Sequence, residues 1–548
     1  SAAHFSRLNR PVRVLDQWMY HTRLYRAADM AGNNDDIELV QLNSFGCGLD
    51  AVTTDQVEEL MTNKNKLYTV LKIDEGSNLG AVKIRIRSLK AAMEERDKNN
   101  IKPSKSDVFF KRKFFTRQMK RDYTLLIPQM SPIHFELLAP AINHSGYKAE
   151  LLPSVDTHAV EEGLRYINND ACYPTIVSLG QIISTLKSGK YDLDKTAVFM
   201  SQTGGGCRAS NYVALLRKAL IDLKMEQIPV ISVNMSGLEK NPGFKFTLPM
   251  IKRALMAMVY GDVLMKVLYA TRPYEVTEGS ANALYEKWNQ TAIKNIEKGS
   301  LRKFRNNIRK MVEDFDKLPL KDIKKPKVGV VGEILVKYHP NANNDIVGII
   351  EEEGGEAVVL DLIDFFLYGM HSKEYNFKNL SGKYSTMVLN SAAIRVIEYF
   401  RAPARKALEE SNRFEPPLYI EDMAKKAAQI VSLGNQYGEG WLLTGEMIEL
   451  IDSGVENIVC LQPFACLPNH VTGKGMLKAL RNYNSLTNIA AIDYDPGASN
   501  VNQLNRIKLM MATAYKNMKK TNESTADTES SKEPADVKEW KQVKAINE

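Results

Sequence analysis

The stretch Val40-Gln-Leu-Asn-Ser-Phe-Gly-Cys47 recurs 419 residues later as Val459-Cys-Leu-Gln-Pro-Phe-Ala-Cys466. At the same offset, Asp74 in Lys-Ile-Asp-Glu-Gly-Ser corresponds to Asp493 in Ala-Ile-Asp-Tyr-Asp-Pro-Gly. Each copy is typical of a strand, a cysteine loop, a helix, a second strand and an acidic turn into another helix. A β-α-β unit repeated with a cysteine at the same strand end indicates that one cysteine site has been duplicated. We therefore expect the last part of one domain followed by a complete second copy.

The composition is that of a globular protein. The chain has 548 residues, of which 44% are hydrophobic and 25% charged, and this length predicts two or three domains. No uninterrupted apolar run reaches the roughly 18 residues that cross a bilayer, so we expect no membrane span. Five scattered cysteines and no recognisable secretory leader predict a reducing, cytoplasmic location. Because half of the first copy is missing and the chain begins with Ser1, we expect a piece of a longer protein.

The net charge of +8 raises the question of nucleic-acid binding. Much of the basic excess lies in residues 105–121, where Lys and Arg alternate with pairs of Phe. Such interleaving can bind single strands. It is also typical of an amphipathic connector that packs its Phe side chains on a neighbouring lobe and leaves its charges in water. Because no nucleic-acid motif accompanies the segment, the connector is favoured and nucleic acid is not expected as a partner.

Short β-branched runs that alternate with helical patterns predict an α/β protein with parallel sheets. We expect two flavodoxin- or Rossmann-like lobes around a central cleft, joined by helical connectors and preceded by a partial lobe. The expected parts are the partial lobe at 1–95, a basic connector at 96–122, lobe 1 with long helices at 123–320, lobe 2 at 321–519, and a disordered, apolar-poor tail at 520–548. The predicted lobe strands are 124–128, 148–152, 196–200, 229–233, 327–335, 357–360, 430–433, 457–460 and 489–492, and the last helix is expected at 499–519.

Three cysteines lie after a predicted strand and near the start of a helix. Cys172 and Cys207 belong to lobe 1 and Cys466 to lobe 2. Loops of this kind line the ligand crevice of open α/β sheets. A helix N-terminus also lowers the pKa of a thiol and favours the thiolate that binds metal. Three thiolates from two lobes suit an iron–sulfur cluster better than zinc, which uses local cysteine pairs. Isolated thiols are the alternative, and Cys460, inside an apolar strand, is predicted to be a core residue.

The residues around Cys207 strengthen the cluster hypothesis. Gly204, Gly205 and Gly206 precede it. Consecutive glycines allow the backbone to approach a bulky ligand and leave amide groups free for sulfide or an anion. Arg208 could stabilise a negative cluster or an anionic ligand, or it could form an ordinary surface ion pair.

Four phrases around these cysteines resemble the large activase-related proteins of the 2-hydroxyacyl-CoA dehydratase superfamily. They are Asn-Asp-Ala-Cys-Tyr-Pro, Gly-Gly-Gly-Cys-Arg-Ala-Ser-Asn-Tyr, Gln-Pro-Phe-Ala-Cys-Leu-Pro-Asn-His-Val-Thr-Gly-Lys-Gly and Ile-Asp-Tyr-Asp-Pro-Gly-Ala-Ser. The resemblance extends to about Lys519, and residues 43–56 are similar to the preceding domain of those proteins. In that superfamily, α/β lobes hold an iron–sulfur cluster through three cysteines, and an ATP-hydrolysing activase supplies low-potential electrons. Members dehydrate 2-hydroxyacyl-CoA through a ketyl radical or, as double-cubane proteins, reduce small molecules.

Carried onto this chain, the resemblance implies that Cys172, Cys207 and Cys466 ligate a 4Fe–4S cluster, or an 8Fe–9S double cubane. Cys47 would be the matching ligand of the first copy. ATP would bind only to the activase, which is the expected partner, and the substrate would be an acyl-CoA or another small molecule. Pairing with the missing first domain or with a second copy is also expected. The competing hypothesis is a non-catalytic scaffold or electron-relay domain that docks the activase modules.

Two polar residues are candidate catalytic groups. Glu333 follows a strand in Val-Gly-Glu-Ile-Leu, where it could meet a substrate or only cap the next helix, and the same loop contains His339. His470 lies four residues after Cys466, where it could donate a proton to substrate or cluster sulfide, or cap the following helix. The Gly-rich loop 435–441 could gate the cleft or serve as a turn between helices.

Overall fold

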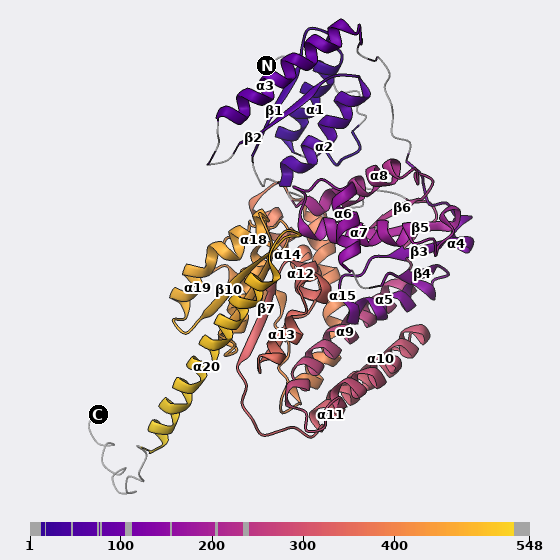
Figure 1. The fold of residues 1–548 in the computed structure, drawn as a ribbon. Helices are drawn as coiled ribbons and strands as arrows, with labels where there is room; N and C mark the ends of the chain where they lie inside the picture. The colour runs from indigo at the N-terminus through magenta and orange to yellow at the C-terminus, as the bar shows by residue number, and fades with distance from the viewer. Residues whose placement is uncertain are drawn as a thin grey trace, which may run out of the picture.

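The computed structural model describes residues 12–16, 18–44, 48–73, 76, 79–102, 104, 112–153, 156–202, 207–233 and 241–530. Its helices surround three sheets whose strands all run parallel, and this confirms the predicted α/β class. Figure 1 shows three parts: an N-terminal unit at the top, lobe 1 in magenta beneath it, and lobe 2 in orange and yellow.

The four-stranded sheet of lobe 1 has the order β4-β3-β5-β6. Its first strand, β3, therefore lies between the second and the third. Buried clusters cover the two faces, one built around Ile182, Leu216 and Val198 and the other around Leu125 and Ile231. The elements are β3 (Thr124–Ile127), α5 (Pro132–Asn143), β4 (Lys148–Leu151), α6 (Thr157–Tyr166), α7 (Tyr173–Lys187), β5 (Thr196–Ser201), α8 (Tyr212–Asp222) and β6 (Val230–Val233).

Lobe 2 has the same topology, with the order β10-β9-β7-β8. Counted along the chain, both sheets read 2-1-3-4, which is the order of the first four strands in flavodoxin-like folds. The first and third strands of each lobe are neighbours, and the chain changes winding direction between them. The elements are β7 (Lys327–Gly332), α12 (Ile334–Tyr338), α13 (Ile346–Glu352), β8 (Glu356–Val359), α16 (Ile420–Ala427), α17 (Gly440–Asp452), β9 (Asn457–Pro463), α18 (Leu467–Thr472), α19 (Leu477–Tyr483), β10 (Asn488–Tyr494) and α20 (Asn500–Ser530).

Two sequence predictions in lobe 2 are wrong. Residues 430–433 form turns after α16 rather than a strand. Val431 is buried there and packs into the core without pairing to any strand, and a short apolar run cannot reveal that difference. The last helix also continues past the predicted end at Lys519 to Ser530, because the polar Lys/Glu/Ser/Thr residues extend its last turns.

The N-terminal unit repeats the last part of lobe 2. It contains α1 (Met19–Gly32), β1 (Leu39–Ser44), α2 (Gly48–Asn63), β2 (Tyr68–Ile73) and α3 (Leu79–Lys98), and β1 pairs in parallel with β2. Ser44 pairs with Ile73, whereas Pro463 pairs with Tyr494, so the second copy is two residues longer between its strands. An even shift keeps each side chain on its original face. The two units share a β-α-β topology with different strand registers, and the duplication stays a prediction.

Long helices join the two lobes. They are α9 (Leu248–Tyr269), α10 (Ser280–Lys298), α11 (Leu301–Asp316), α14 (Ile363–Asn379) and α15 (Tyr384–Glu409). Helix α9 packs on α5 of lobe 1 and on β8 and α15 of lobe 2, and one large core runs through all of them. The segment Leu248–Tyr274 is long and apolar enough to cross a membrane by length and composition, although 72% of its most apolar window is buried inside the protein. The uninterrupted-run criterion missed it because charged residues interrupt the helix.

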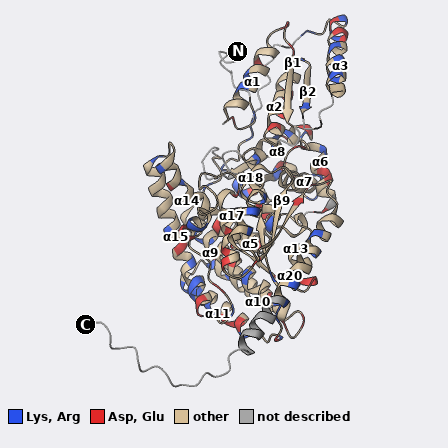
Figure 2. Cartoon of the chain, turned by 90° about the vertical axis from the view of Figure 1, so that its left-hand side faces the viewer, with Lys and Arg blue, Asp and Glu red and all other residues tan. Residues whose placement is uncertain are grey.

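The connector before lobe 1 partly agrees with its prediction. Phe115 is buried in the core of lobe 1, and Arg112 lies over the ring of the half-exposed Phe114, 4.7 Å from its centroid. Residues 105–111, which carry the other Phe pair, lie outside the part of the chain that the structure describes. Figure 2 shows basic and acidic residues interspersed along the helices of all three parts.

Candidate thiol site between the two lobes

The topology brings the predicted loops together. Cys207 follows β5, Glu333 follows β7 and Cys466 follows β9. The prediction that Cys172 also follows a strand is wrong, because α6 lies between β4 and this cysteine, which begins α7. In their sheets, β5, β7 and β9 lie at the point where the winding direction of the chain changes. In open α/β folds, ligands bind in the crevice outside the carboxyl ends of the strands at such a point. The two lobes meet at this point, because Arg208 Nη2 of lobe 1 donates a hydrogen bond of 2.6 Å to the carbonyl oxygen of Ala465 in lobe 2.

The three predicted thiols influence one another; Cys172 is buried, and Cys207 and Cys466 are half-buried. Burial raises the pKa of Cys207 well above its usual value, and repulsion from Cys466 and Cys172 raises it further. Burial also raises the pKa of Cys466 to about 12, with smaller contributions from Glu439 and Cys172. The expectation that a helix start would lower the pKa is wrong for Cys207 and Cys466, since desolvation and repulsion from neighbouring negative groups outweigh the helix dipole. A cation bound to these two sulfurs would compensate the charge of their thiolates.

Each of these cysteines is the residue that begins a helical segment. Cys172 is the N-cap of α7, Cys466 that of α18, and Cys207 that of the 3-10 helix η3 (Arg208–Asn211). This position aims the first amide groups of the segment toward the sulfur. A backbone amide of Ala209 is accordingly a hydrogen-bond donor to Cys207, and the amide of Asn469 to Cys466.

Side chains also donate to the sulfurs. Cys172 Sγ lies 2.9 Å from Thr175 Oγ1 and 3.0 Å from the Tyr212 hydroxyl. Cys466 Sγ accepts a hydrogen bond of 3.2 Å from Asn469 Nδ2. Outer partners of this kind orient metal ligands and stabilise the charge on them.

Two carboxyl groups, the half-buried Glu333 and the buried Glu439, lie near the thiol site. Glu333 Oε2 accepts hydrogen bonds from the amides of Leu335 and Val336, at 3.0 and 2.9 Å, so it does cap α12. Burial, and then the neighbouring Glu439, raise its pKa well above the usual value. After burial, the charges of Cys172 and Glu333 contribute to the raised pKa of Tyr212, so both groups lie near this hydroxyl. The structure confirms that Glu333 caps a helix, and contact of Glu333 with a substrate stays a prediction.

Glu439 is the second of these carboxyl groups. It accepts from the amide of Ile334 at 3.0 Å and from Asn469 Nδ2 at 2.8 Å, and burial raises its pKa. The Gly-rich loop 435–441 holds it in place, with Gly438 and Gly440 at positive φ and Trp441 buried against Tyr368.

The two histidine candidates, His470 and His339, lie in different surroundings. His470 Nδ1 lies 2.9 Å from the carbonyl oxygen of Cys466, and because a carbonyl only accepts, this nitrogen is the donor. His470 lies inside α18, where this bond stabilises the first turn; it does not cap a following helix, and its role as a proton donor stays a prediction. His339, in the same loop as Glu333, has no exposed surface.

Arg208 is not in a surface ion pair. Its guanidinium is buried and donates to two backbone carbonyls, those of Asp170 and Ala465, at 3.4 and 2.6 Å. Gly48, the first residue of α2, lies against this guanidinium, and a Cβ atom there would overlap it. Arg208 thus contacts all three parts of the molecule. The predicted ligand residues Gly204, Gly205, Gly206 and Cys47 lie outside the described residues.

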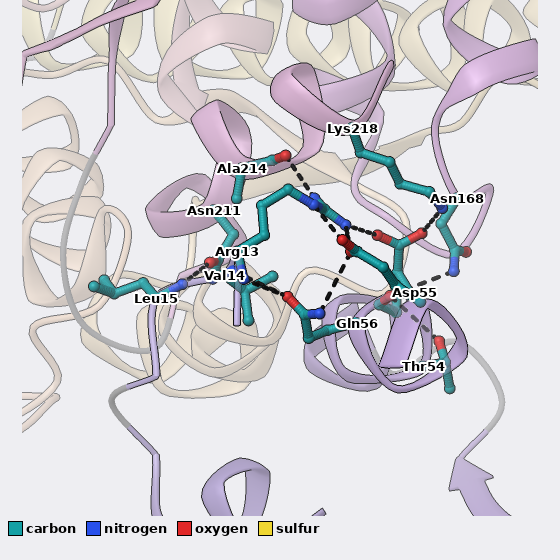
Figure 3. A network of polar contacts seen from close by, with 12 residues as sticks. Arg13, Val14, Leu15, Thr54, Asp55, Gln56, Asn168, Asn211, Ala214 and Lys218 are labelled. Atoms are coloured by element: carbon teal, nitrogen blue, oxygen red, sulfur yellow. Dashed lines mark hydrogen bonds and ion pairs between the residues drawn. The ribbon is translucent and has the colours of Figure 1, made fainter. Parts of the chain in front are cut away.

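A buried polar network docks the N-terminal unit on α8, the helix that follows the η3 segment beginning at Cys207 (Figure 3). The Arg13 side chain has no exposed surface and bonds Asp55 at 3.1 Å, Glu59 at 2.6 Å and the carbonyl of Ala214 at 2.6 Å. Asp55 also pairs with Lys218 of α8. Because α8 follows η3 directly, the position of the N-terminal unit is coupled to that of the Cys207 loop.

Sequence reasoning missed Tyr212, Thr175 and Asn469. A signal for two of them was present, because Thr175 and Asn469 each follow an N-cap cysteine by three residues, and in a helix the side chain at that position reaches back to the N-cap. Tyr212 has no such signal, because its contact with Cys172 crosses from α8 to α7.

Within the described residues, no group of three or more His, Cys, Asp or Glu side chains is arranged to hold a single metal ion. A cluster of several irons distributes its thiolates over different irons and does not require them to meet at one point. A scan of the chain against models of known protein families finds no match, and a search of curated protein sequences finds none either.

Proposed function

We propose that this chain is an iron–sulfur redox protein similar to the 2-hydroxyacyl-CoA dehydratases. In this proposal it accepts low-potential electrons from an ATP-hydrolysing activase and reduces or dehydrates a small substrate, such as an acyl-CoA. One observation carries the proposal: Cys172, Cys207 and Cys466, from two lobes, lie near enough for the charges of Cys172 and Cys466 to raise the pKa of Cys207, and each sulfur has a hydrogen-bond partner. A cytoplasmic, reducing location belongs to the same proposal.

The residues present fit a 4Fe–4S cluster. Cys172 and Cys207 would hold it from lobe 1 and Cys466 from lobe 2, and three thiolates would leave one iron open, which supplies one-electron chemistry at low potential. Neutral thiols must lose their protons to bind metal, and the amide, hydroxyl and carboxamide donors already aimed at the sulfurs would stabilise the resulting thiolates. An 8Fe–9S double cubane is the larger alternative for the same donor set.

The surrounding residues would bind and protonate rather than transfer electrons. Burial keeps the carboxyl groups of Glu333 and Glu439 protonated to higher pH than usual, and a neutral carboxyl beside a redox site can donate a proton to a reduced substrate. Buried aromatic side chains such as Trp441 and Tyr368 exclude water on the side of lobe 2. The hydrogen bond from Arg208 to the carbonyl oxygen of Ala465 connects the two lobes beside the site.

The first experiment measures iron and acid-labile sulfide on anaerobically purified or reconstituted protein. We expect about four iron atoms per chain, with a broad absorption near roughly 400 nm. The Cys207→Ser variant should lose most of this iron. The control is Cys460→Ser, because Cys460 is a fully buried cysteine that lies within β9, in the core of lobe 2. Wild-type protein without iron, or a Cys207→Ser variant with full iron, would contradict the proposal.

A second measurement separates the enzyme from the electron relay. The iron-loaded protein is reduced, and its absorption is followed after candidate acyl-CoA substrates are added. Reoxidation that depends on a substrate and leaves a chemically changed product supports the enzyme. Reoxidation only by protein electron acceptors identifies a relay or scaffold that docks the activase modules.

A further inference from the structure

The sulfur of Cys172 has two hydroxyl groups within hydrogen-bond distance. Thr175 Oγ1 lies at 2.9 Å and the Tyr212 hydroxyl at 3.0 Å. A thiol has one proton, so it can donate to only one of them, and the other hydroxyl must donate to the sulfur. When a metal displaces the thiol proton, the sulfur can only accept hydrogen bonds, and both hydroxyls can then donate to it.

The two hydroxyls differ in where they come from. Thr175 lies in the first turn of α7, three residues after Cys172, so its contact is local. Tyr212 is the first residue of α8 and directly follows η3, which begins at Cys207. Its side chain is buried and reaches across to α7. Tyr212 therefore connects the segment of one cysteine to the sulfur of another.

The donors to the other sulfurs are of a different kind. Cys466 accepts from the carboxamide and the amide of Asn469, and Cys207 from the backbone amide of Ala209. A backbone amide can be removed only by proline, which also changes the backbone. Among the described contacts of the three sulfurs, the Tyr212 hydroxyl is the donor that comes from another helix and can be removed without changing a helix cap.

We propose that Tyr212 is a positioning residue that donates its hydroxyl proton in a hydrogen bond to the Cys172 sulfur and thereby strengthens the affinity of the site for an electron. This inference rests on the proposed function. An added electron increases the negative charge on the cluster and its sulfur ligands, and a donor aimed at a sulfur stabilises the reduced form more than the oxidised form. No bond is broken, and the proton remains on the tyrosine oxygen.

The experiment compares Tyr212→Phe with Tyr368→Phe in the iron-loaded full chain. Tyr368 is a matched control: its buried hydroxyl is near enough for Cys207 to affect its pKa, yet it has no hydrogen-bond partner among the described residues. We expect Tyr212→Phe to keep its iron and to hold an electron about tenfold less tightly, which lowers the one-electron midpoint potential by about 59 mV. Tyr368→Phe should keep the wild-type potential. The potential is read by an anaerobic titration followed by electron paramagnetic resonance.

A second variant tests the direction of the effect. A fluorotyrosine incorporated at position 212 is a stronger hydrogen-bond donor of nearly the same shape, so the midpoint potential of that protein should lie above that of the wild type.

Full iron with an unchanged potential in Tyr212→Phe, or equal shifts in Tyr212→Phe and Tyr368→Phe, would overturn the role of Tyr212 alone. Wild-type protein without iron would overturn both this inference and the proposed function. Loss of iron in Tyr212→Phe with full iron in the fluorotyrosine protein would show that the hydroxyl holds the ligand in place instead of tuning its potential, and would also overturn the inference.

Discussion

At the scale of single residues, burial decides the chemistry of the site more than helix ends do. The cysteines occupy N-cap positions, and yet burial raises the pKa values of Cys207 and Cys466. The same effect governs other titratable groups in lobe 2. His339 has no exposed surface, and neither ring nitrogen has a hydrogen-bond partner on another described residue.

Burial lowers the pKa of His339 from about 6.5 to about 4. Between these values the unfolded chain binds a proton that the folded protein does not, so the free energy of unfolding must fall as the pH falls through this window. We expect His339 to contribute a loss of about 2 kcal/mol between about pH 7 and about pH 5. Urea unfolding at several pH values measures this loss, and it should shrink by that amount in His339→Leu.

This test compares how steeply the free energy of unfolding depends on pH in the wild type and in His339→Leu. His21 and His371, whose pKa values burial also lowers, contribute equally to the wild type and the variant, so their effect cancels. Parallel curves of unfolding free energy against pH for the two proteins would show that His339 is accessible to protons in the folded state.

At the scale of elements, two glycines set the position of α7, the helix that begins at Cys172. Gly163 of α6 lies against the carbonyl of Ile176, and Gly180 of α7 lies against the carbonyl of Ala159. A Cβ atom at either position would overlap backbone, which cannot move aside as a flexible side chain can. The two helices therefore approach backbone to backbone, and this close packing fixes where Cys172 lies relative to β5 and the Cys207 loop.

We expect Gly180→Ala to destabilise the protein by about 1–3 kcal/mol, because the added methyl group overpacks the α6–α7 contact. The control is Gly369→Ala in the middle of α14, where an added Cβ meets no atom within 4 Å. There alanine should stabilise the helix by up to about 1 kcal/mol through its higher helix propensity. Thermal or urea unfolding measures both, and changes of the same sign would disprove the packing argument.

At the scale of the whole molecule, the N-terminal unit and the two lobes converge on the loops that carry the cysteines. Arg208 contacts all three parts, and the network around Arg13 attaches the N-terminal unit to α8 (Figure 3). The partial first copy is thus docked beside the thiol site of the second copy.

We expect Arg13→Ala to release the N-terminal unit from lobe 1. Removing one member of a buried ion pair leaves its carboxylates uncompensated and costs about 3 kcal/mol or more. Hydrogen exchange should become faster in α1 and α2 and remain unchanged in β7 and β9. The control is Arg309→Ala, whose ion pair with Glu313 is half-exposed and contributes at most about 1 kcal/mol. Unchanged exchange in α2 of the Arg13 variant would show that other contacts hold the unit.

Much of the fold follows from local sequence patterns. Alternating β-branched runs and helical stretches predicted the parallel α/β class, and eight of the nine predicted lobe strands are present. The exception, residues 430–433, fails because an apolar residue such as Val431 can fill a core without joining a sheet. The predicted end of the last helix at Lys519 is wrong for the opposite reason, since polar residues that lack an apolar face can still extend a helix.

The sequence by itself determined which residues begin the helices of the site and therefore where the cysteines lie along the chain, because strand ends and N-caps are local properties. Only the tertiary structure decided that Cys172, Cys207 and Cys466 lie near enough to influence one another, that Tyr212 reaches the Cys172 sulfur, and that Arg208 bonds backbone carbonyls. These contacts join segments far apart in the chain. The sheet order and the packing of α6 on α7 fix them, and neither is written in any short stretch of sequence.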